Sequence, residues 1–170
     1  VLNQMFVKLT ISDIELVSQQ EAQRIYKLSS GDSLLYNHNK TWVDCFNDNV
    51  KKYPNNIAVV DKESSITYKE LDDKSNNIAN YLIEYDWKEN SAVVVACKRR
   101  KEFIIAITAI NKAGYAYVPI DPEYPDNIRD YIIESSGAKV VLNDEKIKNI
   151  IKTSPKNQNI NKSKPENIAY

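Results

Sequence analysis

Short apolar segments alternate with longer amphipathic segments along the second half of the chain, and this alternation restricts the fold more than any other feature. The short segments are rich in valine, which is typical of strands that are buried on both faces. The longer segments carry apolar residues at helical spacing. Strands and helices that alternate through short loops form a parallel sheet with helices packed on it. We therefore expect an α/β fold, a three-layer sandwich with a mainly parallel sheet.

The predicted elements follow directly from these patterns. In the helix predicted at residues 101–113, we expect the inward face to carry Phe103, Ile104, Ile107 and Ile110. Strands are predicted at residues 92–97, 116–120 and 138–142, and helices at residues 101–113, 125–136 and 144–151.

The sequence before residue 92 divides into a leader and the start of the globular domain. Residues 1–40 are loop-like apart from one predicted helix from about Ser18 to Leu28, so we interpret them as a linker. Regular periodicity begins at residue 41, and we place the domain at residues 41–170. Its first elements are a helix with Trp42, Phe46 and Val50 on one face, and two strands at residues 57–61 and 64–67.

The end of the chain changes character once more. From residue 153 to Pro165 the sequence is rich in Lys, Asn, Ser and Pro, which predicts a mobile loop. Residues 166–170 then resemble the beginning of another strand.

The segment ITYKEL, residues 66–71, has the pattern that begins a helix. Thr67 is placed to cap the helix, and Glu70 is placed to reach back to the free N–H of Thr67. Ile66 and Leu71 flank the pair as a hydrophobic staple. Because capping boxes are common, we expect Glu70 to be a capping group rather than an acid catalyst, by roughly ten to one.

Charge and cysteine content argue against several classes of protein. Lys and Arg number 23, as do Asp and Glu, so the chain lacks the basic field of a nucleic-acid-binding protein. The longest apolar run is far shorter than a membrane span. Cys45 and Cys97 are isolated, which predicts two reduced, buried thiols in a cytosolic protein. Because His38 is the only histidine and no paired cysteines occur, we expect no metal site.

The chain has only three glycines, and their positions argue against a phosphate-binding loop. Gly114 and Gly137 each follow a predicted helix, where a left-handed residue is favoured. Lys112 lies in the last turn of the first of these helices, where a cation stabilises the helix dipole. Gly31 lies in the leader. A cradle for phosphate needs several glycines close together, so we expect none here.

Three prolines lie three residues apart, one inside the predicted strand at residues 116–120 and two after it. A polyproline docking segment is one interpretation, but a rigid turn in which Pro125 opens the next helix explains them better, at roughly nine to one. Asp121 either fixes this turn by hydrogen bonding or faces a ligand at the carboxyl end of the strand. We favour the first interpretation. Pro119 and Pro122 are the two prolines that bound this turn.

The sequence KRRK, residues 98–101, is the densest cluster of charge. It follows a buried strand, and ligands bind at the carboxyl ends of parallel strands. A solvated loop is nevertheless favoured at roughly three to one. Four cations at a helix N-terminus oppose the helix dipole, and an acidic partner or an anion nearby would offset this. No Ser/His/Asp set and no acid/base pair can be assembled from the chain.

Two segments together resemble the first two core motifs of the adenylation domains of nonribosomal peptide synthetases. They are ITYKEL (66–71) and NKAGYAYVPIDPEYP (111–125). The family typically has Leu-Thr-Tyr-x-Glu-Leu and Leu-Lys-Ala-Gly-x-Ala-Tyr-(Leu/Val)-Pro-Leu-Asp. Ile66, Asn111 and Ile120 depart from the pattern, since the family favours Leu there, and we expect Asn111 to weaken packing slightly at its helix end. The segment ISDIELVSQQE (11–21) is similar to the linker that follows a condensation domain. We assign structural roles to the motif residues Thr67, Tyr68, Glu70, Leu71, Lys112, Ala113, Gly114, Ala116, Tyr117, Pro119, Asp121, Pro122 and Pro125.

The resemblance implies the N-terminal part of a ligase domain that activates an amino acid with ATP and magnesium. The complete domain would form an aminoacyl-adenylate and pass the acyl group to a carrier-protein thiol. Its phosphate loop, ribose-binding aspartate and catalytic lysine would follow Tyr170. We therefore expect no catalytic, cofactor-binding or metal-binding residue in this chain, and no activity from the chain alone.

The resemblance also implies partners. They are the remainder of the adenylation domain and the neighbouring condensation and carrier-protein domains, in the cytoplasm, without nucleic acid or membrane. Two alternatives stay open. The chain could belong to another acyl-adenylate-forming ligase, such as an acyl-CoA ligase, or it could be a non-enzymatic α/β docking module.

Overall fold

The computed structural model describes residues 17–31, 37–153 and 158–170, and it divides into two compact units at residues 37 and 38. The first unit contains one described helix, α2 (Gln19–Ser29), whose N-terminus is capped by Ser18 and whose residues are all exposed. The helix agrees with the one predicted from about Ser18 to Leu28. Most of the linker-like segment at residues 11–21 lies outside the described residues, and the proposed linker at residues 1–40 stays a prediction.

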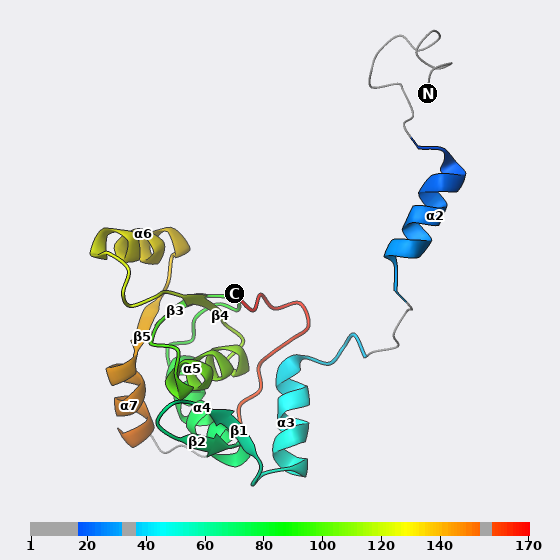
Figure 1. Ribbon diagram of the computed structural model, residues 1–170. Helices are drawn as coiled ribbons and strands as arrows, with labels where there is room; N and C mark the ends of the chain where they lie inside the picture. Colours follow the sequence, from blue (N-terminus) through cyan, green and yellow to red (C-terminus); the bar gives the residue numbers. More distant parts are fainter. Residues whose placement is uncertain (1–16, 32–36, 154–157) are drawn as a thin grey trace. The chain divides into compact units, whose positions relative to one another are not determined.

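The second unit has the strand–helix alternation that the sequence predicts (Figure 1). Its elements are α3 (Trp42–Lys52), β1 (Ile57–Val60), β2 (Ser65–Thr67), α4 (Tyr68–Ile83), β3 (Ala92–Ala96), α5 (Lys101–Lys112), β4 (Ala116–Pro119), α6 (Asp126–Ser136), β5 (Val140–Asn143) and α7 (Asp144–Thr153).

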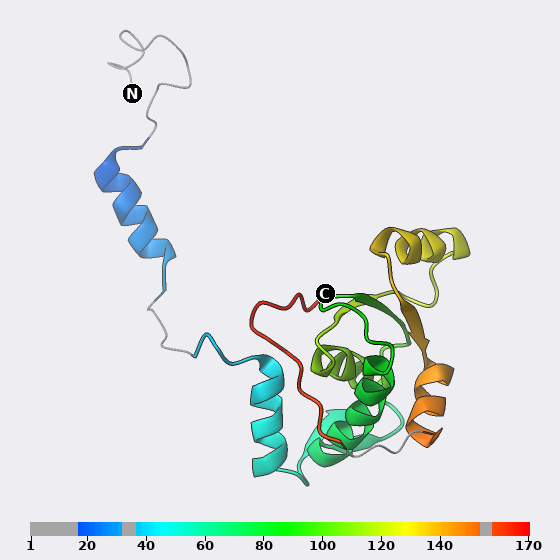
Figure 2. The ribbon, with the colours of Figure 1, turned by 180° about the vertical axis from the view of Figure 1, so that it is seen from behind.

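A three-stranded parallel sheet lies at the centre of this unit, in the order β4-β3-β5. Val94 in the middle strand is paired with Val118 on one side and Val141 on the other. Figures 1 and 2 show α6 on the opposite side of the sheet from α5 and α7. The strands β1 and β2 form a separate antiparallel pair. The predicted α/β fold with a parallel sheet is therefore confirmed.

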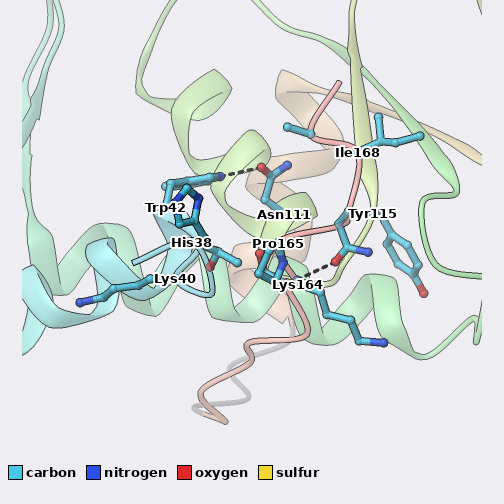
Figure 3. Close-up of a pocket in the computed structure, with 12 residues that line it drawn as sticks. His38, Lys40, Trp42, Asn111, Tyr115, Lys164, Pro165 and Ile168 are labelled. Atoms are coloured by element: carbon cyan, nitrogen blue, oxygen red, sulfur yellow. Dashed lines mark hydrogen bonds between the residues drawn. The ribbon is translucent and has the colours of Figure 1, made fainter. Parts of the chain in front are cut away.

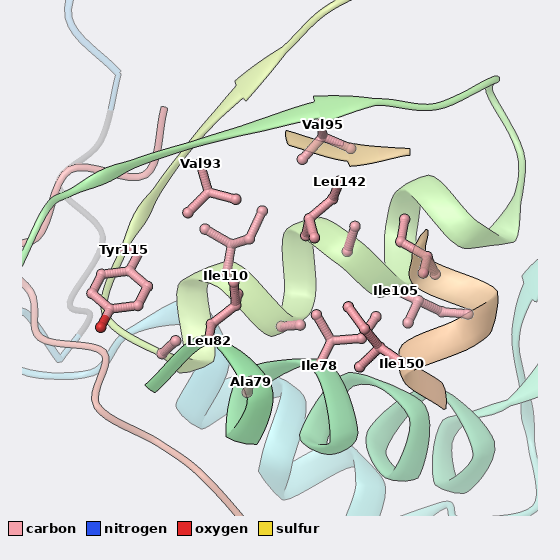
Figure 4. Close-up of a cluster of buried hydrophobic side chains, with 14 of the residues drawn as sticks. Ile78, Ala79, Leu82, Val93, Val95, Ile105, Ile110, Tyr115, Leu142 and Ile150 are labelled. Atoms are coloured by element: carbon pink, nitrogen blue, oxygen red, sulfur yellow. The ribbon is translucent and has the colours of Figure 1, made fainter. Parts of the chain in front are cut away.

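The hydrophobic core fills the space between the sheet and the pair α4 and α5 (Figure 4). Val93 and Val95 point from the central strand toward α5 and are fully buried. All three central valines of β3 are inaccessible, as expected for a strand covered on both faces. The helices contribute Ile78, Ala79, Leu82, Ile105, Ala109 and Ile110, with Leu142, Ile147 and Ile150 from β5 and α7.

The inward face predicted for α5 packs on the core but is incomplete. Phe103, Ile104 and Ile107 are half-buried, whereas Ile105 and Ile110 are almost completely buried. The helix lies between the sheet and α4, so its apolar residues contact neighbours on two sides. Apolar periodicity identifies a buried face only when another face of the helix is polar. Because α5 is apolar on most sides, the sequence does not distinguish its most buried face from its neighbours.

Helix α3 shows a smaller correction. Val43 and Phe46 are its buried residues, whereas Trp42 is 45% exposed and lies at the edge of the packed face. Cys45 is exposed, which contradicts the prediction of a buried thiol, because the packed face of α3 is too narrow to include it. Cys97 is buried as predicted, and both thiols are free.

The C-terminal segment, residues 158–170, packs against the domain instead of forming the loose loop that was predicted up to Pro165. Residues 154–157 of that loop lie outside the described residues. The Lys162 N–H donates to the carbonyl of Lys112 at 2.7 Å, and the Ile168 N–H donates to Asn90 Oδ1 at 2.8 Å. Residues 166–170 are not a strand, although the Tyr117 N–H of β4 donates to the carbonyl of Ala169 at 3.0 Å.

Candidate functional site

The segment ITYKEL forms the capping box that its sequence predicts. The Glu70 N–H donates to Thr67 Oγ1 at 3.2 Å, and the Thr67 N–H donates to Glu70 Oε2 at 2.8 Å. The hydrogen bonds that the Thr67 N–H and hydroxyl donate to the Glu70 carboxylate lower the pKa of Glu70. Ile66 and Leu71 are both buried in the core, as a hydrophobic staple requires. Glu70 is thus held as a capping carboxylate at the start of α4.

Tyr68 extends this first motif toward α3. Its ring lies 6.1 Å from the ring of Phe46, measured between centroids. The motif therefore joins three elements, because the cap holds α4 to β2 and the ring of Tyr68 packs against α3.

Lys112 has an interaction that the sequence analysis did not predict. Its side chain has no exposed surface, and its Nζ lies 2.5 Å from Asp72 Oδ1 and 2.8 Å from Asn76 Oδ1, both on α4. The ring centroid of Phe46 is 5.2 Å away, within cation–π distance. Burial lowers the pKa of Lys112, and the ion pair with Asp72 opposes this shift. Lys112 lies in the last turn of α5, as predicted, and its buried side chain also forms an ionic link between α5 and α4 that the sequence analysis did not predict.

The turn after Lys112 needs glycine for two independent reasons. Gly114 has a φ of +78°, which side chains rarely adopt. A Cβ at this position would also lie 3.0 Å from the carbonyl oxygen of Lys162. Ala113, beside it, is buried. The Lys-Ala-Gly sequence thus closes α5 and lets the C-terminal segment approach within hydrogen-bond distance of the Lys112 carbonyl.

The second motif continues through β4 into a turn rich in proline. Ala116 and Tyr117 pair with Ala92 and Val93 of β3. Pro119 ends β4, which is tolerated because no described strand lies on its other side.

Hydrogen bonds of Asp121 fix the turn itself. Asp121 Oδ1 accepts from the Glu123 N–H at 2.9 Å, and the Asp121 carbonyl accepts from the Tyr124 N–H at 3.1 Å. The carbonyl of Pro122 accepts from Arg129 at 3.2 Å, and Pro125 stands at the N-cap of α6. The predicted turn is confirmed, with Asp121 as its hydrogen-bonding residue.

Acidic residues lie beside the basic cluster at residues 98–101, as the helix dipole argument anticipated. Arg100 Nη1 lies 2.5 Å from Glu63 Oε1, and the Lys101 N–H donates to Asp61 Oδ2 at 3.2 Å. Asp61 accepts backbone hydrogen bonds from Glu63, Ser64 and Lys101, and these lower its pKa to about 2. The carboxylate of Asp61 therefore satisfies the start of α5 from outside the helix.

An open pocket of about 550 Å³, here called the edge pocket, lies at the carboxyl ends of β3 and β4. Ligands of α/β proteins commonly bind in this position. Its lining includes Cys97, Lys98, Phe103, Asp121 and Tyr124. Burial raises the pKa of the Cys97 thiol to about 12, so this group is a protonated thiol and not a nucleophile. The edge pocket has the charge and apolar surface for binding, but this cysteine does not supply chemistry.

Comparison with known proteins gives these motifs a family. The sequence profile described as "AMP-binding enzyme" matches residues 46–168, more than half of the chain. The chain belongs to the AMP-binding enzyme family. It is 37% identical over 139 residues to Gramicidin S synthase 2 of Brevibacillus brevis, which covers 82% of this chain and 3% of that protein. It is 36% identical over 137 residues to Bacitracin synthase 3 of Bacillus licheniformis, which covers 81% of this chain and 2% of that protein.

Solved structures of the family have the same fold. The N-terminal subdomain of Klebsiella oxytoca NpsA, bound to anthranilyl-AMSN, superposes with a TM-score of 0.64 at 21% identity, covering 72% of this chain and 34% of that one. An artificially fused adenylation–PCP di-domain, NpsA-ThdA, gives a TM-score of 0.63 at 20% identity over 74% of this chain and 26% of that one. This member of the AMP-binding family therefore corresponds to the N-terminal part of a nonribosomal peptide synthetase adenylation domain, and it spans only a few per cent of the synthetases it matches.

Proposed function

We propose that this chain is the scaffold part of an adenylation domain that activates an amino acid with ATP as an aminoacyl-adenylate. The complete domain would transfer the acyl group to the thiol of a carrier protein in the same cytoplasmic synthetase, with a condensation domain as a further neighbour. The observation that carries the proposal is the junction of the two motifs. Lys112 of the second motif is bonded to Asp72 and Asn76, which lie on the helix that the first motif begins.

This junction explains what the chain contributes physically. The capping box fixes the start of α4, the buried Lys112 joins α4 to α5, and Gly114 directs the chain into β4. The sheet edge and the turn at Asp121 are thus held in place by interactions inside the domain. Groups that stabilise a transition state must be held rigidly, and a scaffold of this kind supplies that rigidity.

The proposal includes ATP and Mg²⁺, but the described residues fit neither. Gly114 closes a helix against Lys162, and Gly137 closes α6 with a φ of +61°, so neither belongs to a phosphate cradle. Within residues 17–31, 37–153 and 158–170 there is no group of three or more His, Cys, Asp or Glu side chains that could hold a metal ion. We therefore assign no step of adenylation to these residues. The same ranges contain no helix with the length and hydropathy of a membrane span.

An exchange assay between ATP and pyrophosphate tests the proposal. Residues 1–170 alone are expected to give no exchange above a control without protein, with any amino acid. The same residues joined to the remainder of their adenylation domain are expected to give exchange with at least one amino acid. Turnover by residues 1–170 alone would overturn the scaffold role. Exchange by the longer protein with fatty or aromatic acids and not with amino acids would favour the acyl-CoA ligase alternative.

A further inference from the structure

A second pocket lies where α3, the end of α5 and the C-terminal segment meet (Figure 3). We call it the Asn111 pocket. Its volume is about 210 Å³. One wall comes from the residues that lead into α3, including Trp42, and another from Asn111 and Tyr115. The C-terminal segment closes it with residues between Ser163 and Ala169.

Asn111 lines this pocket, and its side chain holds an unused hydrogen-bond donor that is buried in the pocket wall. Its Oδ1 accepts from the indole Nε1 of Trp42 at 2.8 Å. An indole N–H can only donate, so the oxygen of the amide must face Trp42 and the nitrogen must face away. Figure 3 shows this nitrogen on the side away from Trp42, toward the segment that carries Ile168.

The position of Asn111 makes the unused donor costly. The residue is only 6% exposed, and its Nδ2 has no hydrogen-bond partner among the residues that the structure describes. A buried amide donor without an acceptor costs free energy comparable to a lost hydrogen bond. The pocket therefore calls for an acceptor next to Asn111.

The charge around the pocket favours an anionic acceptor. Lys40 and Lys164 both line the pocket, and none of the described residues that line it is Asp or Glu. These lysines pair with Asp48 and Glu89, and in each pair both side chains are at least 39% exposed. Exposed ion pairs contribute little to stability, so either ammonium group can turn toward a ligand at small cost.

The remaining lining is polar at His38, Thr41, Ser163 and Asn167 and apolar elsewhere, and the apolar part would contact the body of the ligand. Trp42, Tyr115, Pro165 and Ile168 contribute rings and aliphatic surface. Since a water molecule occupies about 30 Å³ in the liquid, the 210 Å³ pocket has room for about seven waters. A ligand with one small ring and one carboxylate, such as benzoate, is therefore of a suitable size.

We propose that the Asn111 pocket binds a small monocarboxylate with an apolar body. One carboxylate oxygen accepts from Asn111 Nδ2, the ammonium group of Lys40 or Lys164 approaches the other, and the apolar body lies against Trp42 and Ile168. This inference is independent of the proposed adenylation and would stand if that proposal failed.

Titration of the full chain with benzoate, followed by NMR of ¹⁵N-labelled protein, tests the inference. Saturable shifts of the Trp42 indole signal and the Asn111 side-chain amide signals are expected, with a dissociation constant in the millimolar range for about nine atoms. Benzyl alcohol, which lacks the carboxylate, and acetate, which lacks the apolar body, are each expected to bind about tenfold more weakly or not at all.

Two variants of Asn111 localise the binding. Asn111→Asp keeps an acceptor for Trp42 but replaces the donor with an oxygen that repels a carboxylate, so benzoate binding should fall at least about tenfold. Asn149→Asp is the matched control, because it makes the same change at an exposed position on α7, and it should bind normally. Asn111→Leu, with the residue that the family favours, serves if Asn111→Asp does not fold, and it should also lose binding.

Several results would overturn the inference. They are shifts that grow linearly without saturation, equal responses to benzoate and benzyl alcohol, or unchanged binding in a folded Asn111 variant. An absence of any response at these two side chains would mean that the Asn111 amide is completed by water.

Discussion

Removing Asp72 tests whether the buried ion pair with Lys112 holds α4 and α5 together. The Lys112 side chain has no exposed surface, and that of Asp72 is 15% exposed. In Asp72→Ala the ammonium group would keep hydrogen bonds only to Asn76 Oδ1, at 2.8 Å, and to the backbone carbonyl of residue 72, at 3.5 Å. It would thus stay buried without a carboxylate bonded to it.

The expected magnitudes follow from this geometry. Breaking a buried ion pair by removing one partner costs about 3–5 kcal/mol, and the slight exposure of Asp72 places Asp72→Ala near 3 kcal/mol. Lys112→Met keeps most of the side-chain volume and leaves a carboxylate that water can reach, so it should cost about 1–2 kcal/mol. The double variant should resemble Lys112→Met, because no buried charge is then left unpaired.

Urea denaturation followed by circular dichroism at neutral pH would measure these free energies of unfolding. Lys164→Met is the matched control. It makes the same substitution in an ion pair, with Glu89, whose members are 55% and 59% exposed, and it should change stability by less than about 1 kcal/mol. A domain of this size has a stability of about 5–15 kcal/mol, so the loss in Asp72→Ala would be easy to detect.

The pH dependence gives a second test of the same reasoning. Burial lowers the pKa of Lys112, so the unfolded chain binds more protons than the folded one above that lowered pKa. Stability then rises with pH toward the ordinary pKa of 10.5. In Asp72→Ala the opposing effect of the carboxylate is gone, and the loss of stability should become smaller at alkaline pH.

The reasoning would be refuted by either of two outcomes. One is a loss in Asp72→Ala no larger than that in Lys164→Met. The other is a double variant whose loss equals the sum of the two single losses, because the ion pair would then contribute no coupling.

Three further predictions concern other parts of the chain. Gly114→Val should lower the free energy of unfolding by about 1–3 kcal/mol through strain and the contact with Lys162, while Gly31→Val should leave the melting temperature unchanged because its surroundings are open. The pKa of Asp61 lies below its ordinary value only in the folded state, so the wild-type chain should lose stability as the pH falls from 3.8 to about 2. In Asp61→Asn this loss should be smaller. An unchanged acid profile would contradict the hydrogen bonds described. Limited proteolysis should cut between Ser29 and Lys40 and leave a folded domain, and protection there equal to that of the core would reject the linker.

Patterns within a few residues of one another carried most of the correct predictions. Thr67 and Glu70 are three positions apart, so the capping box is visible in the sequence without knowledge of the fold. The left-handed conformation at Gly114 and Gly137 follows from the helix that each glycine ends. The hydrogen bonds of the turn at Asp121 are similarly local. Backbone sterics and hydrogen bonds over short separations are properties of the sequence itself.

The tertiary structure decided what happens to side chains whose partners are far along the chain. The sequence places Lys112 in the last turn of a helix, but its ion pair with Asp72 joins residues that are 40 positions apart and depends on the packing of α4 on α5. Asn111 reads as a weakly packed substitute for leucine, and its bond to Trp42 joins residues separated by 69 positions. The burial of residues on α5 depends on the sheet and α4 covering it from two sides. In each case the free energy comes from a contact that exists only after the chain has folded, so short-range sequence patterns contain no record of it.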